Sequence, residues 1–559
     1  MTSLYLFSSL LLFWLCIPFA IKLLNRVKES RKGDIFLMEE SGSKQHNDEP
    51  THNSSHAIHT SLFQIRYTTT VLNGPFRKAA AFVPNFWKNW FTIGVCFGLA
   101  AMIFGFGLVL LAGWRISLIL CQSWLDHTGN TGELPINGPS DHSGQLIIPM
   151  IPGVTLPLSH VAYYLVALLL SGIVHEVGHS IAAMSERVPV HSFGVFVIFL
   201  YPGAFVAVSS RHLARLYPFR KLRVICAGVW HNAVLFLIVW CLLSSGAMNF
   251  CFSLVGWAEL HPNDGVAVVN VAADSPLNAF LSQSSLIIGL NDQPLSDGLD
   301  SWNQILLGTV LENAPEHRKG FCASQPEIEV EPLECCDISQ QYPFGQSHNE
   351  SISCFTTLVP LGEQLEEDIG SKYACLPSIK TVTQNQRCKI DTDCDFYHQD
   401  GFTSGNCMVP FSPQPNVRLL RMFFREPEWN TGSKVAQSDK MVVFLGDYAE
   451  VWNTVQVSIL KPRWWFVPAS LPLMIESVLR YILSFTLALS ILNILPAYHL
   501  DGHHALSAIL SILFSSSEQN NNGMVQLRKA MEKSILIVTS ILIGWVIIGS
   551  LVLTLLGLH

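Results

Sequence analysis

Two histidines four residues apart flank a glutamate in the stretch His175-Glu176-Val177-Gly178-His179. On an α-helix, residues four apart share one face and lie about 6 Å apart along the axis, so both imidazoles can reach one metal ion. Zinc peptidases hold Zn²⁺ with two such histidines and use the glutamate to take a proton from the bound water. The spacing therefore predicts a hydrolytic zinc site with His175 and His179 as ligands and Glu176 as the acid–base group.

The setting of this motif is apolar, because Leu165–Val174 precede it and Ile181–Met184 follow it without a charged residue. Ionisable groups at membrane depth cost several kcal/mol unless they are paired or ligated. Three of them together favour a functional site. The alternative is a buried polar cluster that only braces a helix bundle.

A second polar stretch, residues 493–504, begins with Asn493 at the end of another apolar run. Pro496 ends or kinks a helix, and Gly502 relieves the backbone directly after Asp501, so this acid can lie on irregular backbone facing the interior. Catalytic zinc usually has three protein ligands plus water, and a carboxylate is a normal third ligand. Spacing alone does not exclude three competing residues: His499, His503 and His504.

A third apolar run carries Gly228-Val229-Trp230-His231-Asn232. An imidazole and an amide at membrane depth could line the same cavity as the zinc motif. Asn232 is equally suited to hydrogen bonding between helices, and we interpret His231 as structural rather than as a ligand.

Composition indicates the elements that must position these residues. The chain has 559 residues, of which 49% are hydrophobic and 14% charged, with a mean hydropathy of +0.34. These values exclude an ordinary soluble protein and predict several membrane spans. No long basic run or nucleic-acid motif is present, so we expect a lipid bilayer and no nucleic acid as a partner.

Six apolar runs are near or above the roughly 20 residues that a bilayer requires. They are Leu4–Leu24, Phe91–Leu120, Ser159–Met184, Leu222–Leu243, Leu473–Leu495 and Ile535–Leu556. We interpret the first as an uncleaved anchor, because its basic residues follow the apolar run. Phe193–Val208 is shorter and is broken by Pro202-Gly203, so we expect a re-entrant hairpin or strand packed against protein.

The distribution of basic residues predicts on which side of the membrane each loop lies. A count of six spans puts four basic clusters on one side, which the positive-inside rule makes cytosolic. They are Lys22–Lys32, Arg77–Lys88, Arg211–Arg223 and Arg528–Lys533. The zinc motif then lies toward the cytosolic half of the bilayer, and the loop from about Phe250 to Val467 lies on the opposite, lumenal side.

This long loop contains eight of the 14 cysteines, at 322, 335, 336, 354, 375, 388, 394 and 407. An even set without Cys-x-x-Cys spacing predicts disulfides rather than a zinc ribbon, with 105 possible pairings. Disulfides indicate an oxidising lumen. A possible glycosylation triplet begins at Asn349.

Short β-like runs begin after Gly265, with Val266–Val269 followed by Leu286–Pro294, and predict a small sheet domain. Their order is similar to that of a PDZ domain. The cysteine-rich stretch interrupts it, and we expect Met441–Leu445 and Val455–Leu460 to close it. Such a module could bind a peptide end by strand addition or could only screen the site.

The zinc motif together with the Asn493-x-x-Pro496 and Leu500-Asp501-Gly502 pattern resembles the site-2 protease family of intramembrane metalloproteases. The likeness to its animal members extends from about Ser61 to Leu506. It includes Tyr201–Phe205, Cys226–Asn232 and Glu334–Cys336.

The resemblance implies one Zn²⁺ on His175, His179 and Asp501, with Glu176 as the catalytic carboxylate. It places Asn232 and Asn493 on polar positions near the site, which we interpret as substrate-binding. The implied substrates are membrane-anchored transcription factor precursors, such as sterol regulatory element-binding proteins, cut within their single span after a first lumenal cut. The alternative is a non-enzymatic zinc-binding membrane receptor or a metal transporter.

We therefore expect an α-helical polytopic membrane protein with an inserted lumenal β-rich, PDZ-like, disulfide-bonded domain. The resemblance implies a glycoprotein of the Golgi or endoplasmic reticulum membrane that acts in sterol and stress signalling. The expected domains are an N-terminal anchor and juxtamembrane segment, 1–90; a membrane core with the zinc motif, 91–250; the lumenal domain, 251–467; and a C-terminal membrane core, 468–559.

Overall fold

The structure is a computed structural model. It describes residues 56–61, 63–128, 155–307, 319–329, 352–358, 373–398, 401–411, 418–427, 429, 439–514 and 522–556. The expected first span, Leu4–Leu24, lies outside these residues, as do Cys335, Cys336 and Asn349.

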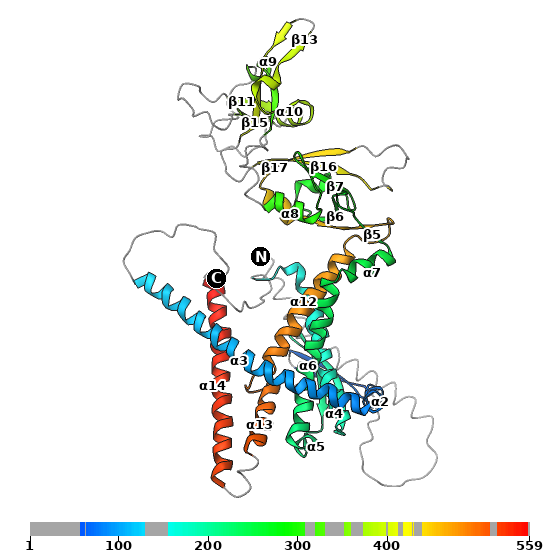
Figure 1. The fold of residues 1–559 in the computed structure, drawn as a ribbon, viewed down its shortest axis with the longest axis vertical. Coiled ribbons are helices and arrows are strands. Elements are labelled where there is room, and N and C mark those ends of the chain that lie inside the picture. The colour runs from blue at the N-terminus through cyan, green and yellow to red at the C-terminus, as the bar shows by residue number, and fades with distance from the viewer. Residues whose placement is uncertain are drawn as a thin grey trace, which may run out of the picture. The chain divides into compact units, whose positions relative to one another are not determined.

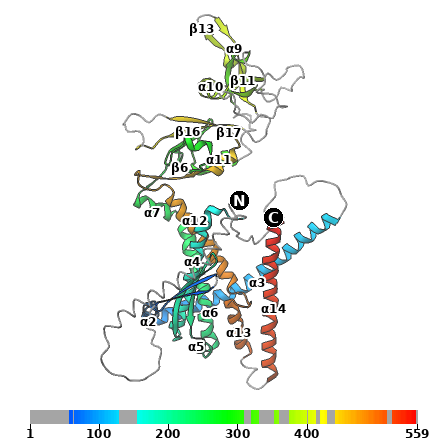
Figure 2. The same cartoon turned by 180° about the vertical axis from the view of Figure 1, so that it is seen from behind.

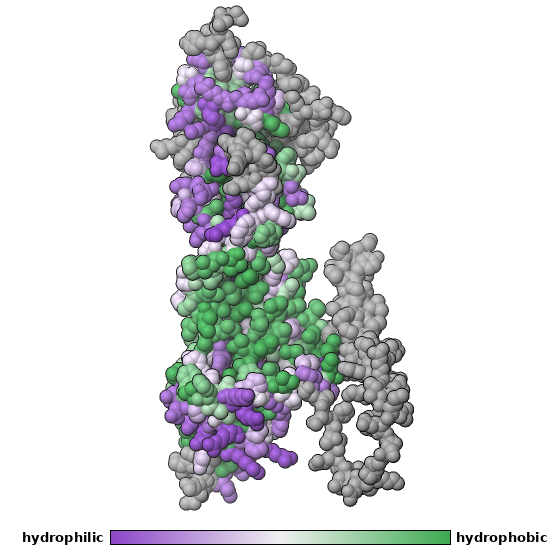
Figure 3. Space-filling view, turned by 90° about the vertical axis from the view of Figure 1, so that its right-hand side faces the viewer, coloured by the Kyte–Doolittle hydropathy of each residue, from purple (hydrophilic) through white to green (hydrophobic). Residues whose placement is uncertain are grey.

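The chain forms two compact units. The first, residues 1–245 and 475–559, contains most of the long helices, and the second, residues 246–474, contains most of the strands. Figures 1 and 2 show the two units from opposite sides. In the space-filling view, hydrophobic residues form a band over the helices, and hydrophilic residues gather over the β-rich unit and also at one end of the helical unit (Figure 3).

Five helices among the described residues are long and apolar enough to cross a membrane. They are α3 (Pro84–Thr128), α4 (Val161–Ser185), α6 (Pro218–Ser244), α12 (Leu471–Leu492) and α14 (Asn522–Leu556). Each covers one of the apolar runs predicted as a span, so these five predictions are confirmed. Shorter helices in the same unit are α2 (Asn73–Phe82), η1 (Leu158–His160), α5 (Ser210–Ala214) and α13 (Asp501–Phe514).

The short run broken by Pro202-Gly203 forms a hairpin, as predicted. Its strands, β3 (Val190–Ile198) and β4 (Tyr201–Val208), pair antiparallel and join a four-stranded sheet of order β1-β2-β3-β4. The other two strands, β1 (His56–Ser61) and β2 (Gln64–Thr69), come from the segment interpreted as juxtamembrane. They were not predicted, because their partner strand lies more than a hundred residues away along the chain.

The helical unit packs closely where α4 meets α6. At Gly178 in α4, an added Cβ would lie 2.6 Å from the carbonyl oxygen of Ala227 and 2.3 Å from Nδ1 of His231. Only glycine allows the two backbones this approach. Small buried residues continue the contact on both helices: Ala182, Ala183, Ala227 and Cys226.

The β-rich unit is built on one long sheet with the order β17-β16-β7-β6-β18, to which β8 adds beside β7. Its strands are β6 (Val266–Val271), β7 (Leu286–Leu290), β8 (Gln293–Pro294), β16 (Arg418–Arg425), β17 (Lys440–Gly446) and β18 (Val455–Ser458). Two helices, α8 (Leu299–Leu307) and α11 (Tyr448–Thr454), contribute Trp302 and Val451 to a core of buried aliphatic residues. The strands predicted on both sides of the cysteine-rich stretch thus lie in one sheet.

The cysteine-rich stretch forms a second sheet of order β11-β10-β15-β9-β12. Its strands are β9 (Gly320–Ser324), β10 (Ile352–Thr357), β11 (Tyr373–Pro377), β12 (Arg387–Cys388) and β15 (Gly405–Pro410). Smaller elements of the unit are α7 (Ala247–Val255), β5 (Trp257–Glu259), η2 (Pro276–Ala279), α9 (Gln325–Glu329), α10 (Ser378–Gln384), η4 (Asp391–Cys394), β13 (Phe396–His398), β14 (Gly401–Thr403) and β19 (Leu460–Pro462).

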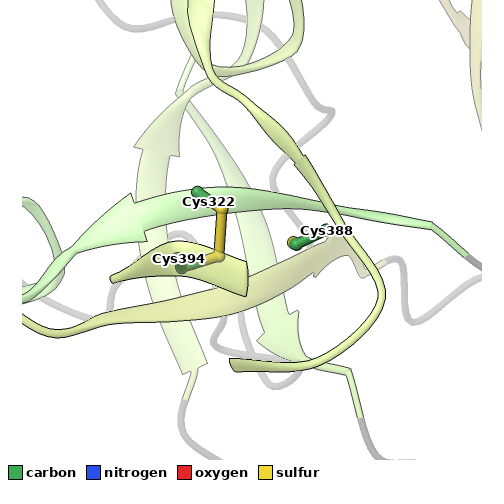
Figure 4. Close-up of side chains that lie close together, drawn as sticks. All are labelled: Cys322, Cys388 and Cys394. Carbon is green, nitrogen blue, oxygen red and sulfur yellow. A yellow bond between two sulfur atoms is a disulfide. The ribbon is translucent and has the colours of Figure 1, made fainter. Parts of the chain in front are cut away.

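Disulfide bonds cross-link this second sheet. Cys322 bonds Cys394, and Cys388 bonds Cys407, and Figure 4 shows the first of these bonds with Cys388 beside it. Cys354 and Cys375 are also disulfide-bonded. The expected fold class, a helical polytopic membrane protein with a β-rich disulfide-bonded insertion, is confirmed.

Candidate active site

Helix α4 positions both histidines of the zinc motif on the face that packs against α6. Their Nε2 atoms lie 3.1 Å apart. Oδ2 of Asp501 lies 3.0 Å from Nε2 of His175 and 3.2 Å from Nε2 of His179. Residues far apart in the sequence thus bring two imidazole nitrogens and one carboxylate oxygen to a single point.

Helix α6 orients one of these imidazoles through its backbone. Nδ1 of His179 lies 2.8 Å from the carbonyl oxygen of Val224. A carbonyl only accepts, so Nδ1 carries the proton and Nε2 presents its lone pair. On the other imidazole, Nδ1 of His175 lies 3.3 Å from the side-chain nitrogen of Asn232, a fully buried residue of α6.

Asp501 reaches the histidines because the chain turns sharply before α13. The amide of Gly502 donates to the carbonyl of Asn493 at 2.8 Å. An added Cβ at Gly502 would lie 2.1 Å from the carbonyl oxygens of both Ile494 and Leu495. Glycine is therefore required here, and its tight contact places Asp501 at the first position of α13.

The space in front of the two histidines is kept open by Gly228 in α6. A Cβ at this position would lie 2.5 Å from Nε2 of His179 and 2.6 Å from Nε2 of His175. Zinc–nitrogen bonds are about 2.0–2.1 Å, so a metal ion and a side chain at residue 228 would compete for the same region. The donor set of two imidazoles and one carboxylate is chemically suited to Zn²⁺. The residues present fit a catalytic metal ion.

Glu176 lies beside this cluster on α4 but does not belong to it. The backbone amide of Val206, in strand β4, donates to its Oε2 at 3.0 Å. The carboxylate is half-buried. A carboxylate next to a metal site and hydrogen-bonded to a strand edge can accept a proton from a water molecule without binding the metal itself.

Comparison with known proteins agrees with this geometry. Residues 163–531 match the model of peptidase family M50. The chain belongs to this family of membrane metalloproteases. It is also 26% identical over 454 residues to a protein of Arabidopsis thaliana, a membrane-bound transcription factor site-2 protease homolog, with 76% of this chain and 80% of that protein covered.

In this M50 peptidase the structure brings one of the candidates for the third ligand beside the two histidines. Asp501 joins the cluster, whereas His499 and His504 are exposed, and among the described residues no histidine other than His175 and His179 belongs to it. His231 instead places Nδ1 3.1 Å from the carbonyl oxygen of Ala227 and packs its ring against Phe91. Its interpretation as a structural residue agrees with these contacts.

The two asparagines interpreted as substrate-binding both lie near His175. The side-chain nitrogen of Asn493 is 3.4 Å from Nε2 of His175, and Asn493 is half-buried. Asn232 is fully buried. Sequence reasoning missed two further contributions, the open space at Gly228 and the amide of Val206, because a glycine and a backbone group leave no chemical signature in the sequence.

Proposed function

We propose that this M50 peptidase is a zinc-dependent endopeptidase that hydrolyses a peptide bond within the membrane. His175, His179 and Asp501 hold Zn²⁺, and Glu176 is the catalytic acid–base group. The observation that carries the proposal is the convergence of three metal-ligand atoms within 3.2 Å of one another. They meet at a space kept by glycine, and the two histidines lie on a helix apolar enough to span a membrane.

Bound zinc would polarise the scissile carbonyl and activate a water molecule. Glu176 accepts the proton of that water and returns it to the nitrogen of the departing peptide. The hydrogen bond from Val206 holds Oε2 of the carboxylate against β4, and we assign the proton transfer to Oε1.

The cytosolic location of the site is supported by the ion pairs at the nearby end of α4. Glu186, which caps this helix, is buried, and Nη1 of Arg223 lies 2.9 Å from its Oε1. Arg220 lies 3.8 Å away from the second oxygen. The zinc motif is only a few residues from this basic end, which the positive-inside rule makes cytosolic.

Protease added to the cytosolic face should then spare the β-rich unit. Digestion of the β-rich unit from that face would contradict its lumenal assignment.

The substrates in this proposal are membrane-anchored transcription factor precursors with a single span, including those of the sterol regulatory element-binding type. The support is the similarity to the site-2 protease homolog of Arabidopsis and the membrane setting of the site. A first cut on the lumenal side precedes this one, and the released cytosolic part carries sterol and stress signals. The enzyme resides in the membranes of the secretory system, with the Golgi as the proposed compartment.

A substrate helix must open before it can be cut, because each interior carbonyl is bonded to the amide four residues on. Opening it in hydrocarbon exposes backbone groups at several kcal/mol each. Strand β4 is the edge of its sheet, and the Val206 amide points from that edge to Glu176. The edge can pair with an unwound substrate segment, and the amide of Asn493 can bind a substrate carbonyl.

The test combines metal analysis with cleavage of paired substrates in which lumenal trimming is already complete. The two substrates differ only in Asn, Pro or Gly residues of the span, which are replaced by Leu in one of them. Replacement should slow release of the cytosolic fragment by roughly tenfold or more, since Gly lowers helix stability by about 1 kcal/mol and Pro by about 3 kcal/mol. Equal rates would contradict the need for helix opening, and absence of metal and cleavage would overturn the proposed function.

The Glu176→Gln variant separates this function from metal transport. It should bind metal as the wild type does and should lose cleavage. Retained cleavage would exclude Glu176 as the acid–base group, and metal transport that persists in the variant would favour a transporter.

A further inference from the structure

An exposed hydrophobic surface, here called the α7 patch, lies at the base of the β-rich unit. It consists of Phe250, Leu254 and Val255 on α7 and Trp464, Trp465 and Phe466 in the loop before α12. The two parts meet, since an added Cβ at Gly256, directly after α7, would lie 3.3 Å from the ring of Trp464. The rings of Trp464 and Phe466 are stacked at 5.8 Å.

Helix α7 is hydrophobic on both of its faces. Its inner face buries Phe252 against Trp257 and Leu460. Its outer face exposes Phe250 and Leu254, which are four residues apart and therefore adjacent on the helix surface. A helix that is hydrophobic all round is normally buried in protein or lipid, and exposed apolar patches mark interaction sites.

The position of the α7 patch in the chain indicates what covers it. The hydrophobic core against which α7 packs includes Leu471. This residue is the first of α12, and α12 is a candidate membrane span. On its other side, only two residues separate the end of the candidate span α6 at Ser244 from the start of α7. The patch is thus tied at both ends to segments that enter a bilayer. Tryptophan is enriched at membrane interfaces, and the exposed Arg463 next to the patch is suited to lipid phosphates.

We propose that the α7 patch inserts into the interfacial layer of the membrane and anchors the β-rich unit to lipid. Phe250, Leu254 and the aromatic loop contact acyl chains near the headgroups, and α7 lies along the membrane surface. A lipid surface explains the combination of exposed aromatic residues and flanking spans without requiring a protein partner.

Depth-dependent fluorescence quenching tests this proposal in the full-length protein, reconstituted in phosphatidylcholine–phosphatidylserine vesicles. A fluorescent amino acid is encoded at Trp465, which is 77% exposed, and in a matched control at Trp452, which is 41% exposed elsewhere in the same unit. Lipids brominated on the upper acyl chain should quench position 465 several-fold more than 452, and aqueous iodide should do the reverse. Strong iodide quenching at 465 would overturn the proposal. Protection of 465 from both quenchers would also overturn it, because a protein would then cover the patch.

A second inference concerns Asn232 and depends on the proposed zinc site. Its Oδ1 is buried and has no hydrogen-bond partner among the residues that the structure describes. Its Nδ2 faces Nδ1 of His175 at 3.3 Å. If Nε2 of His175 binds a metal, its Nδ1 must carry the proton. Nδ1–H of His175 and Nδ2 of Asn232 would then face each other as two donors, while the acceptor Oδ1 of Asn232 stays unpaired.

Exchanging the amide oxygen and nitrogen by a half-turn of the side chain removes this conflict, because the two ends of the amide have nearly the same shape. We infer that Oδ1 of Asn232 accepts a hydrogen bond from Nδ1–H of His175. Asn232 is then a positioning residue that acts through His175, and its complete burial agrees with a role inside the protein rather than on substrate.

One face of α6 would then position both histidines and leave room for the ion. Val224, Gly228 and Asn232 are spaced four residues apart and share a face of the helix. Val224 orients His179 through its carbonyl, Gly228 leaves room for the ion, and Asn232 orients His175. Hydrogen bonds of this kind, from a metal-binding imidazole to a protein acceptor, fix the ring and raise metal affinity.

Two variants of Asn232 provide the test. Asn232→Leu removes the acceptor at similar volume, and Asn232→Asp keeps an acceptor in either orientation. Zinc affinity, measured by competition with a chelator, should fall about 10- to 100-fold in the first variant and stay near the wild-type value in the second. The visible spectrum of the Co²⁺-loaded protein should likewise change more in Asn232→Leu than in Asn232→Asp.

Unchanged zinc affinity in Asn232→Leu would overturn the inference, as would an equal loss in both variants. Absence of zinc binding in the wild type would instead overturn the proposed function. The two failures are therefore distinguishable.

Discussion

Among the residues that the structure describes, metal-ligand atoms gather in two places, and the two places differ in how these atoms are bonded. In the β-rich unit the sulfur atoms of Cys322, Cys388 and Cys394 lie together. In the helical unit the atoms belong to His175, His179 and Asp501. The sulfur atoms are bonded in disulfides. The two nitrogens and the oxygen instead meet with their lone pairs directed at one space.

Closeness of ligand atoms alone therefore does not define a metal site. A disulfide sulfur is not a thiolate and does not bind Zn²⁺ as one. In the β-rich unit the carboxylate of Asp292 likewise has charged partners within the protein, because it pairs with both Arg387 and Arg421. Among the described residues, the partners of the Asp501 carboxylate are His175 and His179, so a bound cation is the natural partner of this group.

Removal of a ligand should have the largest effect. His175→Ala, His179→Ala and Asp501→Ala should each lose metal and all measurable cleavage, because two remaining ligands hold zinc too weakly. Glu176→Ala should keep metal and lose about 10²- to 10⁴-fold in rate, the usual contribution of an acid–base group. Metal content by mass spectrometry and fragment release check both. Metal retained with full activity in Asp501→Ala would assign the third ligand to another residue.

The disulfides should affect stability and leave the metal site unchanged. Cys322 and Cys394 are 72 residues apart, and Cys388 and Cys407 are 19 apart. Loop-closure entropy then predicts losses of about 4 and about 3 kcal/mol for the paired Cys→Ser variants. Hydrogen exchange of β9 and β15 in the full-length protein measures the loss. A fall in zinc content in these variants would contradict the separation of the two clusters.

Gly228→Ala tests the open space directly without removing any ligand. The added methyl group would lie within 2.6 Å of both Nε2 atoms, so the imidazoles must move apart. We expect zinc affinity to fall by about 100-fold, comparable to the loss of an orienting partner. The control is Gly107→Ala in α3, where an added Cβ meets nothing within 4 Å. Wild-type affinity in Gly228→Ala would show that the ion does not use this space.

The charge pairs of the β-rich unit should give the smallest effect, and it should depend on pH. Burial alone would raise the pKa of Asp292, but hydrogen bonds from Arg387 and Arg421 outweigh it and lower this pKa below its usual value. A lowered pKa in the folded state contributes stability above about pH 4, and this contribution is lost as the pH falls through the folded pKa.

Arg421→Met should therefore destabilise the sheet by about 1.5 to 3 kcal/mol at neutral pH, the range for hydrogen bonds to charged groups. The difference from the wild type should shrink as the pH drops below about 4. Hydrogen exchange of β7 and β16 at several pH values measures it. A difference that stays constant with pH would assign the effect of Arg421 to packing against Phe321.

Local patterns were sufficient for much of the molecule. The spans are visible in the sequence because a run of about 20 apolar residues has no other stable location. The zinc motif is visible because helical spacing makes His175 and His179 neighbours whatever the rest of the chain does. The even cysteine set between Cys322 and Cys407 likewise predicted disulfides, although it left the pairing open.

The remaining features depend on contacts between distant segments. Spacing left His499, His503 and His504 as alternatives to Asp501, and the fold brings Asp501 to 3.0 Å from His175, 326 positions away in the sequence. The strands β1 and β2 are too short and polar to be recognised without their partner β3.

Local spacing and composition are enough to predict a membrane protein, the helix that carries His175, Glu176 and His179, and an oxidised β-rich insertion. The other groups that lie at the site are brought there by contacts between distant segments. The close approach of α4 to α6 gives Gly228 its open space and Val224 and Asn232 their contacts with the imidazoles. The tight turn at Gly502 brings in Asp501. These contributions come from backbone positions in three dimensions, which no local pattern of side chains encodes.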